Sequence, residues 1–149
     1  MSTLLPTPKG EWAEVCFAAE ILRRGWRISR PYGDSGPYDC VVDVAGRVSR
    51  VQIKAVAAAR RGTRYPYVVK LIRGRFNHLT YSAREIDVIA VLIVPKSLWY
   101  IVPVSAIEGW KHMGFSGKKH AVWKRKRKHT VDLEKYREAW QFLKGSRLG

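Results

Sequence analysis

The stretch from Pro37 to Ala55, PYDCVVDVAGRVSRVQIKA, decides the fold. Apolar residues dominate its first half and alternate with polar residues in its second half, and Ala45-Gly46-Arg47 between them suits a tight turn. The pattern predicts a β-hairpin with strands over residues 37–44 and 48–56. Because successive side chains of a strand point to opposite faces, Gln52 and Lys54 share one face. Asp39 lies near the start of the first strand, so we expect acid, amide and lysine to meet in one pocket.

Length and charge bound the class of protein. The chain has 149 residues, which fits a single domain spanning 1–149, and its hydrophobic fraction of 46% is ordinary for a globular core. It carries 28 Lys and Arg against 12 Asp and Glu, a net charge of +16. Such an excess predicts a polyanionic partner, most often nucleic acid. A basic ribosomal protein or a membrane-surface protein is the alternative.

The sequence indicates a soluble, intracellular and cytoplasmic protein. Its longest apolar run, Val88 to Val94, is too short to cross a bilayer, so we expect no membrane association. The N-terminal residues lack the basic region and apolar stretch of a signal peptide. Cys16 and Cys40 lack CxxC spacing and are interpreted as buried thiols in a reducing compartment.

The elements around the hairpin predict an α/β fold, a mixed β-sheet of about five strands flanked by helices. Thr7 as N-cap and Gly25 as terminator bound a first helix over residues 8–24. Its buried face is predicted to consist of Trp12, Val15, Cys16, Ala19 and Leu22. Further strands are expected over 26–30, 65–72, 87–94 and 98–102, a helix or turn over 81–86, a short helix from 103 to 110, a solvated basic segment over 111–129, and a C-terminal helix over 132–144.

Three features stand in a characteristic order: Gly10-x-x-x-Glu14 on the helix, Asp39 at a strand start, and Gln52-x-Lys54 on the next strand. This order resembles the PD-(D/E)XK nuclease superfamily, most closely its small group I intron homing endonucleases and secondarily the archaeal Holliday junction resolvases. The resemblance runs from about Lys9 to Ile107 and implies a restriction-endonuclease-like core. The later stretch from Tyr81 to Pro103 also looks like the homing enzymes.

The resemblance implies Mg²⁺-dependent hydrolysis of double-stranded DNA, with Mn²⁺ as a substitute ion. Asp39 would bridge the metal and the scissile phosphate, Gln52 would fill the second acidic position, and the Ile53 carbonyl would be a further ligand. Lys54 would orient the attacking water or help to deprotonate it. Glu14 would reach the metal directly or through water. Hard oxygen ligands of this kind suit Mg²⁺.

Two residues depart from the family pattern. Tyr38 stands where the family has proline, at a position that is loose in the family. Gln52 replaces an acid, and a neutral amide should hold the metal less tightly. Gln-x-Lys also occurs in the homing-enzyme branch, but it could instead mark a binding domain without catalysis. Glu11 is the rival to Glu14 for the helix acid.

Two other acids are given structural roles. We expect Asp43 to pair with Arg47 or Arg50, and Asp87 to be a capping or turn carboxylate. The four histidines have no partner at metal-ligand spacing, which argues against zinc. The sequence has no glycine-rich phosphate loop, so no nucleotide cofactor is expected.

Basic residues flank the predicted site in two groups, and such residues contact phosphates without reading sequence. The predicted DNA-binding residues are Arg60, Arg61, Arg64, Arg73, Arg75, Lys118, Lys119, Lys124, Arg125, Lys126 and Arg127.

Three functions follow from these patterns. The leading hypothesis is a site-specific, homing-type endonuclease that acts as a symmetric homo-oligomer, a dimer or a tetramer, because one site per chain cuts one strand of a duplex. The second is a Holliday junction resolvase or other structure-specific nuclease. The third is a basic nucleic-acid-binding module without catalysis.

Overall fold

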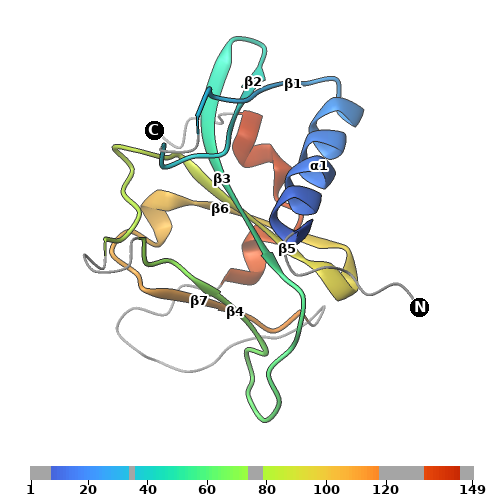
Figure 1. The fold of residues 1–149 in the computed structure, drawn as a ribbon, viewed down its shortest axis with the longest axis vertical. Helices are drawn as coiled ribbons and strands as arrows, with labels where there is room; N and C mark the ends of the chain where they lie inside the picture. The colour runs from blue at the N-terminus through green and yellow to red at the C-terminus, as the bar shows by residue number, and fades with distance from the viewer. Residues whose placement is uncertain (1–7, 34–35, 74–78, 118–132, 145–149) are drawn as a thin grey trace.

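The computed structural model describes residues 8–33, 36–73, 79–117 and 133–144. Its centre is a five-stranded sheet in the order β1-β2-β3-β5-β6 (Figure 1). The strands are β1 (Arg27–Ser29), β2 (Cys40–Val44), β3 (Arg47–Val56), β5 (Val88–Ile93) and β6 (Leu98–Pro103). The β3–β5 pair is parallel and the other pairs are antiparallel. The predicted mixed sheet and α/β class are confirmed.

The predicted hairpin is the pair β2–β3, joined at Ala45 and Gly46, which both have positive φ angles of 52° and 88°. β3 is longer than β2 and continues beside β5 past the first residue of β2. The six residues of β5 are all buried, as the uninterrupted apolar run predicts for a central strand. One edge of β3 is therefore left open beyond the start of β2, and the candidate site lies at this opening.

A second sheet pairs β4 (Tyr67–Lys70) with β7 (His112–Phe115). The sequence predicts the β4 strand but not its separate sheet. β7 corrects the prediction of a solvated segment over 111–129, because Met113 and Phe115 are buried. Residues 118–129 of that segment lie outside the described ranges.

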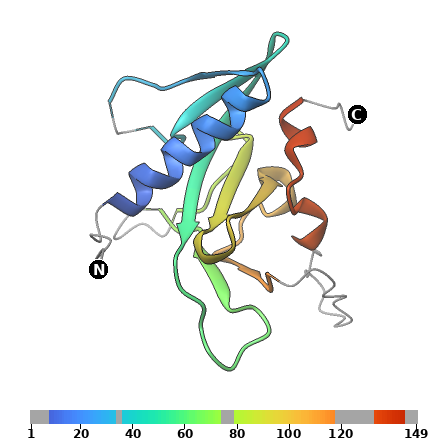
Figure 2. The same cartoon turned by 90° about the vertical axis from the view of Figure 1, so that its right-hand side faces the viewer.

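The main sheet lies between helix α1 (Pro8–Arg23) and the small sheet (Figures 1 and 2). Two adjacent residues of β6 show the two faces. The Trp99 ring lies 5.5 Å from the Phe17 ring of α1, whereas the Tyr100 ring lies 4.2 Å from the Phe115 ring of β7. By strand register, Ile53 shares the Trp99 face and Lys54 shares the Tyr100 face.

The bounds of α1 agree with prediction to within a residue, but its buried face does not. The helix buries Ala13, Phe17 and Ile21, which are at most 1% exposed. The predicted face is largely in solvent, with Trp12 at 48% and Leu22 at 61% exposure. The helix carries two apolar stripes, and its packing partner selects the one with four-residue spacing.

The end of α1 follows the predicted glycine stop. Gly25 has a φ of +77°, and its N–H donates to the carbonyl of Leu22 at 2.9 Å. The N–H of Trp26 donates to Ile21 at 3.2 Å, which completes a Schellman motif. This turn leads the chain directly into β1.

The predicted C-terminal helix over 132–144 is wrong. Residues Leu133–Tyr136 and Trp140–Lys144 form two separate 3₁₀ turns, η3 and η4, and Asp132 lies outside the described residues. Between them, Glu138 has a φ of +46°. Its N–H donates to the Trp99 carbonyl at 2.8 Å, and its carboxylate accepts from the Trp99 N–H at 2.9 Å. Bonding to the edge strand β6 therefore replaces continuous helix bonding at this point.

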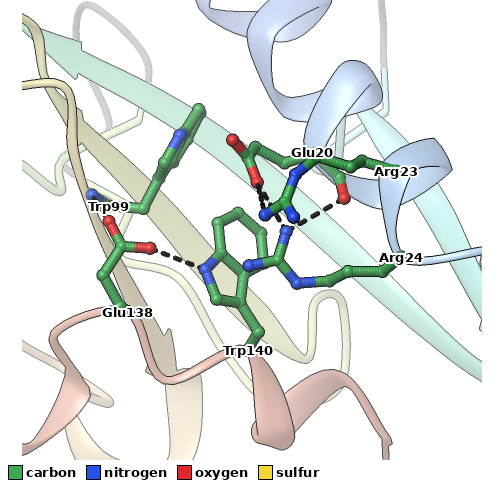
Figure 3. Close-up of polar contacts among 6 residues, drawn as sticks. All are labelled: Glu20, Arg23, Arg24, Trp99, Glu138 and Trp140. Carbon is green, nitrogen blue, oxygen red and sulfur yellow. Dashed lines mark hydrogen bonds and ion pairs between the residues drawn. The ribbon is translucent and has the colours of Figure 1, made fainter.

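The C-terminal turns also pack against α1 (Figure 3). The Arg24 guanidinium lies 4.0 Å from the ring centre of Trp140, and Glu20 accepts hydrogen bonds from Arg23 and Arg24. The Trp140 indole donates to Glu138 at 2.7 Å. The remaining 3₁₀ turns are η1 (Val94–Lys96) and η2 (Val104–Ala106), and the latter takes the place of the short helix expected over 103–110. Within the ranges described, none of the helices is long and apolar enough for a membrane span.

Candidate active site

Asp39 lies directly before β2, where the β2–β3 pairing begins. Its backbone N–H donates to the Val51 carbonyl at 2.8 Å. Its carboxylate oxygen Oδ2 accepts a hydrogen bond from the Ile53 N–H at 2.7 Å. The Asp39 side chain thus takes the place that a further backbone carbonyl of β2 would occupy. This hydrogen bond holds the carboxylate against β3.

The Ile53 carbonyl points to the same edge of β3 as its N–H, because both groups of a strand residue face one neighbour. The Gln52 amide approaches this carbonyl, with Nε2 at 3.5 Å from the Ile53 oxygen. A half-turn of the amide would present its oxygen instead, which is the orientation that a cation requires. The structure therefore brings Asp39, Gln52 and the Ile53 carbonyl together at the start of β2.

Glu14 reaches the same place from α1. Its carboxyl forms a hydrogen bond with the carboxyl of Asp39 and an ion pair with Arg30 at 3.2 Å. A hydrogen bond between two carboxyl groups needs a proton on one of them. Burial raises the pKa of Asp39, while the Ile53 N–H, the charges of Lys54 and Arg30, and the Glu14 hydrogen bond act in the opposite direction. Burial outweighs these effects, so the folded protein holds the proton of Asp39 more tightly than an exposed aspartate would.

A pocket of about 520 Å³ opens beside these two acids, between α1 and the first three strands. It is lined by Glu11, Glu14, Val15, Ala18, Ile28, Arg30, Asp39, Cys40 and Ile53. Glu11 therefore lies in the same pocket as Glu14, but the hydrogen bond to Asp39 favours Glu14 as the helix acid. Burial, with the negative charges of Asp39 and Glu14, raises the pKa of Cys40 to about 12, so this thiol stays protonated.

Lys54 and Gln52 do not line this pocket, contrary to the expectation of one shared pocket. Strand alternation puts them on the face opposite to Ile53. The Lys54 ammonium lies 5.5 Å from the ring centre of Tyr81, yet its charge still acts on Asp39. The candidate site therefore wraps around the open edge of β3, with the two acids on one side and the lysine on the other.

Two residues at the site were missed by the sequence analysis. Arg30 follows β1, and the register that pairs Ser29 with Val41 would have placed it beside the start of β2. Tyr81 lies between two cations, with Arg73 at 5.4 Å and Lys54 at 5.5 Å from its ring. No spacing rule in the sequence links residue 81 to residue 54.

The structure corrects the predicted pairing of Asp43 and gives Asp87, expected as a capping or turn carboxylate, a partner in Arg50. Asp43 does not pair with Arg47 or Arg50 but accepts the Gly46 N–H at 2.8 Å within the hairpin turn. Arg50 instead forms an ion pair with Asp87 at 3.0 Å and donates to the carbonyls of residues 83 and 84. Burial would raise the pKa of Asp87, but the hydrogen bonds and charge of Arg50 outweigh it and lower that pKa.

The predicted DNA-binding residues fall into three groups. Arg60, Arg61 and Arg64 are exposed in the loop between β3 and β4, which the Arg60 N–H closes by donating to the Pro66 carbonyl at 2.8 Å. Arg73 is half-buried and bonded to Glu85. The others lie outside the described residues: Arg75, Lys118, Lys119, Lys124, Arg125, Lys126 and Arg127.

The donor set at the site suits a hard cation. Throughout the described part of the chain, no three residues of the types His, Cys, Asp and Glu gather as a metal site. Here two carboxyls, an amide and a backbone carbonyl are available instead. Mg²⁺ is often held by one or two carboxylates while it keeps several waters, so these residues fit it.

The chain is similar to known proteins over most of its length. A family model described as PD-(D/E)XK endonuclease matches residues 6–143. A solved bacterial homing endonuclease, I-Ssp6803I, is 27% identical over 94% of this chain and 93% of that one, with a TM-score of 0.73. The Holliday junction resolvase Hjc of the archaeal hyperthermophile Archaeoglobus fulgidus is 18% identical over 73% of this chain and 86% of that one, with a TM-score of 0.51. At 18% identity, the likeness to Hjc shows the fold alone.

No curated protein matches the chain. The family match nevertheless spans the first helix, the hairpin and the C-terminal turns, and thus every described element that positions the candidate site. The resemblance noted in the sequence is thereby confirmed: the chain belongs to the PD-(D/E)XK endonuclease family.

Proposed function

We propose that this protein is a Mg²⁺-dependent endonuclease that hydrolyses double-stranded DNA at specific sites, as a homing-type enzyme. The observation that carries the proposal is the contact of the Asp39 carboxylate with Ile53, which sets an acid beside a main-chain carbonyl, the Gln52 amide and Glu14. The similarity to a homing endonuclease over nearly the whole of both chains supports the homing type. The net charge of +16 supports a polyanionic substrate.

In this proposal each residue has a role that its position supports. Asp39, Glu14, Gln52 and the Ile53 carbonyl would hold a divalent ion, and such an ion would supply polarisation of the scissile phosphate and stabilisation of charge on the leaving oxygen. Lys54 orients the attacking water from the other side of β3 and assists its loss of a proton. Arg30 forms an ion pair with Glu14 and so keeps Glu14 directed at Asp39.

The basic residues supply affinity for the duplex. Arg60, Arg61 and Arg64 are exposed on one loop and contact phosphates. Arg73, Arg75 and the lysines and arginines between residues 118 and 127 extend this contact. Such contacts make binding strongly dependent on salt concentration. Because one chain carries one site, double-strand cleavage calls for a homo-oligomer, a dimer or a tetramer.

Cleavage assays with purified protein test the proposal. The substrates are a randomised duplex library and plasmid DNA, with Mg²⁺ or Mn²⁺ as the cation. We expect Asp39→Asn and Lys54→Met each to lower the cleavage rate by about 10²–10⁴-fold, the usual cost of losing a metal ligand or a proton-transfer group. Asp43→Asn is the matched control, since Asp43 is a carboxylate of the same hairpin that serves only the turn.

The alternatives give different results in the same assays. A junction resolvase would cut a four-way junction in preference to linear duplex, without sequence requirement. A binding module would bind DNA tightly and salt-sensitively and cut nothing with either cation. Wild-type rates for Asp39→Asn and Lys54→Met would refute the site assignment.

A further inference from the structure

Arg30 lies at the mouth of the candidate-site pocket. It follows β1 directly, and the register that pairs Ser29 with Val41 sets it beside Cys40, the first residue of β2. Of the nine described residues that line the pocket, three are acids and Arg30 alone is basic. The Arg30 side chain is 73% exposed, whereas that of its partner Glu14 is 25% exposed. The guanidinium is therefore on the solvent side of a pocket whose acids are more enclosed.

The positive charge of Arg30 acts on both acids of the site. Its Nη2 donates a hydrogen bond to Oε2 of Glu14 at 3.2 Å. Burial raises the pKa of Asp39, and the charge of Arg30 is one of the effects that oppose this rise. Arg30 is thus a counter-ion to the two carboxyl groups that the proposed function assigns to a divalent ion.

A guanidinium paired with Glu14 and a cation held by Glu14 and Asp39 compete for the same negative charge. Like charges at such short range repel, and they repel more strongly where the surroundings exclude water. Arg30 can give up its contact easily, because an ion pair with a largely exposed partner contributes little to stability. At 3.2 Å its hydrogen bond is also longer than the about 2.7–2.9 Å that is usual between charged groups.

Arg50 shows how this fold holds an arginine that is fixed. Its guanidinium donates to both carboxylate oxygens of Asp87 and to the backbone carbonyls of residues 83 and 84. The ion pair of Arg30 with Glu14 uses one N–H of a group that has several. The planar guanidinium matches two oxygens of a phosphate. Once it leaves Glu14, Arg30 can donate to a phosphate at the mouth of the pocket, where the strand to be cut must lie.

We propose that Arg30 is a phosphate-binding residue that exchanges partners. It pairs with Glu14 until a divalent ion binds the two acids, and it then donates to a phosphate oxygen of the bound DNA strand. The inference rests on the proposed function and adds to the role of Arg30 in directing Glu14. Binding of DNA at the site then depends on the cation, because Arg30 is available to the phosphate only after it has left its acid.

Calorimetric titration of the full chain with Mg²⁺, without DNA, tests the first half of the exchange. Arg30→Met removes the competing charge and should tighten Mg²⁺ binding by roughly two- to fivefold, the range expected for one exposed charge pair. Arg30→Lys keeps a positive charge and should bind Mg²⁺ like wild type. If Arg30 only directed Glu14, Arg30→Met would weaken Mg²⁺ binding. Weaker or unchanged binding by Arg30→Met would overturn the proposal.

The salt dependence of DNA binding tests the second half. Binding of labelled duplex from the cleavage library is measured in the Lys54→Met variant, in which we expect the DNA to stay largely intact. One phosphate contact contributes about 0.9 to the slope of log K against log salt concentration. Adding Arg30→Met to this variant should reduce the slope by about that amount with Mg²⁺ and leave it unchanged without Mg²⁺.

Arg27→Met is the matched control for the salt series. Arg27 is an exposed arginine of the same strand, and alternation sets its side chain on the face opposite to Ile28, which lines the pocket. Any effect of Arg27→Met on the slope should therefore be the same with and without Mg²⁺. If Arg30→Met also has the same effect in both conditions, or has none in either, the exchange does not occur.

These measurements separate the role of Arg30 from the nuclease proposal, because neither of them requires cleavage. If wild-type protein cuts DNA and the effect of Arg30→Met does not respond to Mg²⁺, only the role of Arg30 is refuted. If the contact of Arg30 depends on Mg²⁺ and wild-type protein cuts nothing, only the nuclease is refuted.

Discussion

The carboxylate of Asp39 replaces a backbone carbonyl in bonding to the Ile53 N–H, at a distance of 2.7 Å. This bond both ends the β2–β3 pairing and fixes the acid of the candidate site. Burial raises the pKa of Asp39, so the folded protein binds the proton of the Asp39 carboxyl group more tightly than the unfolded chain does. The stabilising effect of that proton is complete below the unfolded pKa and is lost as pH rises through the higher folded pKa.

The first prediction concerns stability. In metal-free solution, Asp39→Asn should match wild type at pH 3.5 (a value chosen near the ordinary Asp pKa of about 3.9) and become the more stable protein as pH rises to neutrality. An asparagine oxygen can still accept the Ile53 N–H, and it carries no buried charge. Urea unfolding at a series of pH values measures the difference, with Asp43→Asn as the control. A neutral-pH loss of stability for Asp39→Asn would contradict the account.

The second prediction concerns cation binding. Burial raises the pKa of Asp39 beside Glu14, and a divalent ion that binds the two acids must displace any proton that they hold. Calorimetric titration with Mg²⁺ in buffers of different ionisation enthalpy should therefore show proton release that falls toward zero as pH rises. Glu14→Gln should abolish most of this release. Proton release that does not depend on pH would show that the released proton does not come from Glu14 or Asp39.

The third prediction concerns the lysine. The Tyr81 ring lies 5.5 Å from the Lys54 ammonium, so it helps to hold that charge at the edge of β3. Tyr81→Phe keeps the ring and should keep most of the activity, whereas Tyr81→Leu should lower kcat by roughly tenfold with little change in KM. The pH profile of kcat should also shift for Tyr81→Leu. Equal kcat values for the two variants would deny the ring a positioning role.

The fourth prediction concerns the C-terminal turns. Trp140 is 6% exposed and lies between Phe17 at 5.8 Å, Trp99 at 5.9 Å and the Arg24 guanidinium. Trp140→Ala should lower the free energy of unfolding by about 3 kcal/mol or more, as large truncations in a core do. Trp140→Phe keeps part of the packing and should cost less. Denaturant unfolding of both variants measures this, and a loss below about 1 kcal/mol for Trp140→Ala would show that the turns are not part of the core.

The sequence predicts the hairpin and β5 well because their signals are local. The alternation through residues 48–56 determines which side chains share a face, and the turn at Gly46 sets the register. The same pattern places Asp39 beside β3. Asp39, Gln52 and Ile53 can therefore be brought together from the sequence alone. That Lys54 lies on the other side of the edge from Glu14 depends on how α1 packs, which no strand pattern contains.

The errors arise where tertiary contacts choose between local options. Helix α1 has two apolar stripes, and the sheet takes the one through Phe17 rather than the more evident one through Trp12. Residues 133–144 have a helical pattern, but the free edge of β6 binds Glu138 and divides them into two turns. β7 is short and lies next to a basic run, so its buried Met113 and Phe115 give little periodic signal.

Phe17 near the beginning of the chain and Trp140 near its end have their rings 5.8 Å apart. During synthesis, the aromatic cluster is therefore completed only after the turn Trp140–Lys144 has left the ribosome. A nascent chain that stops short leaves Trp99 and Tyr100 of β6 uncovered, a target for chaperones and proteases.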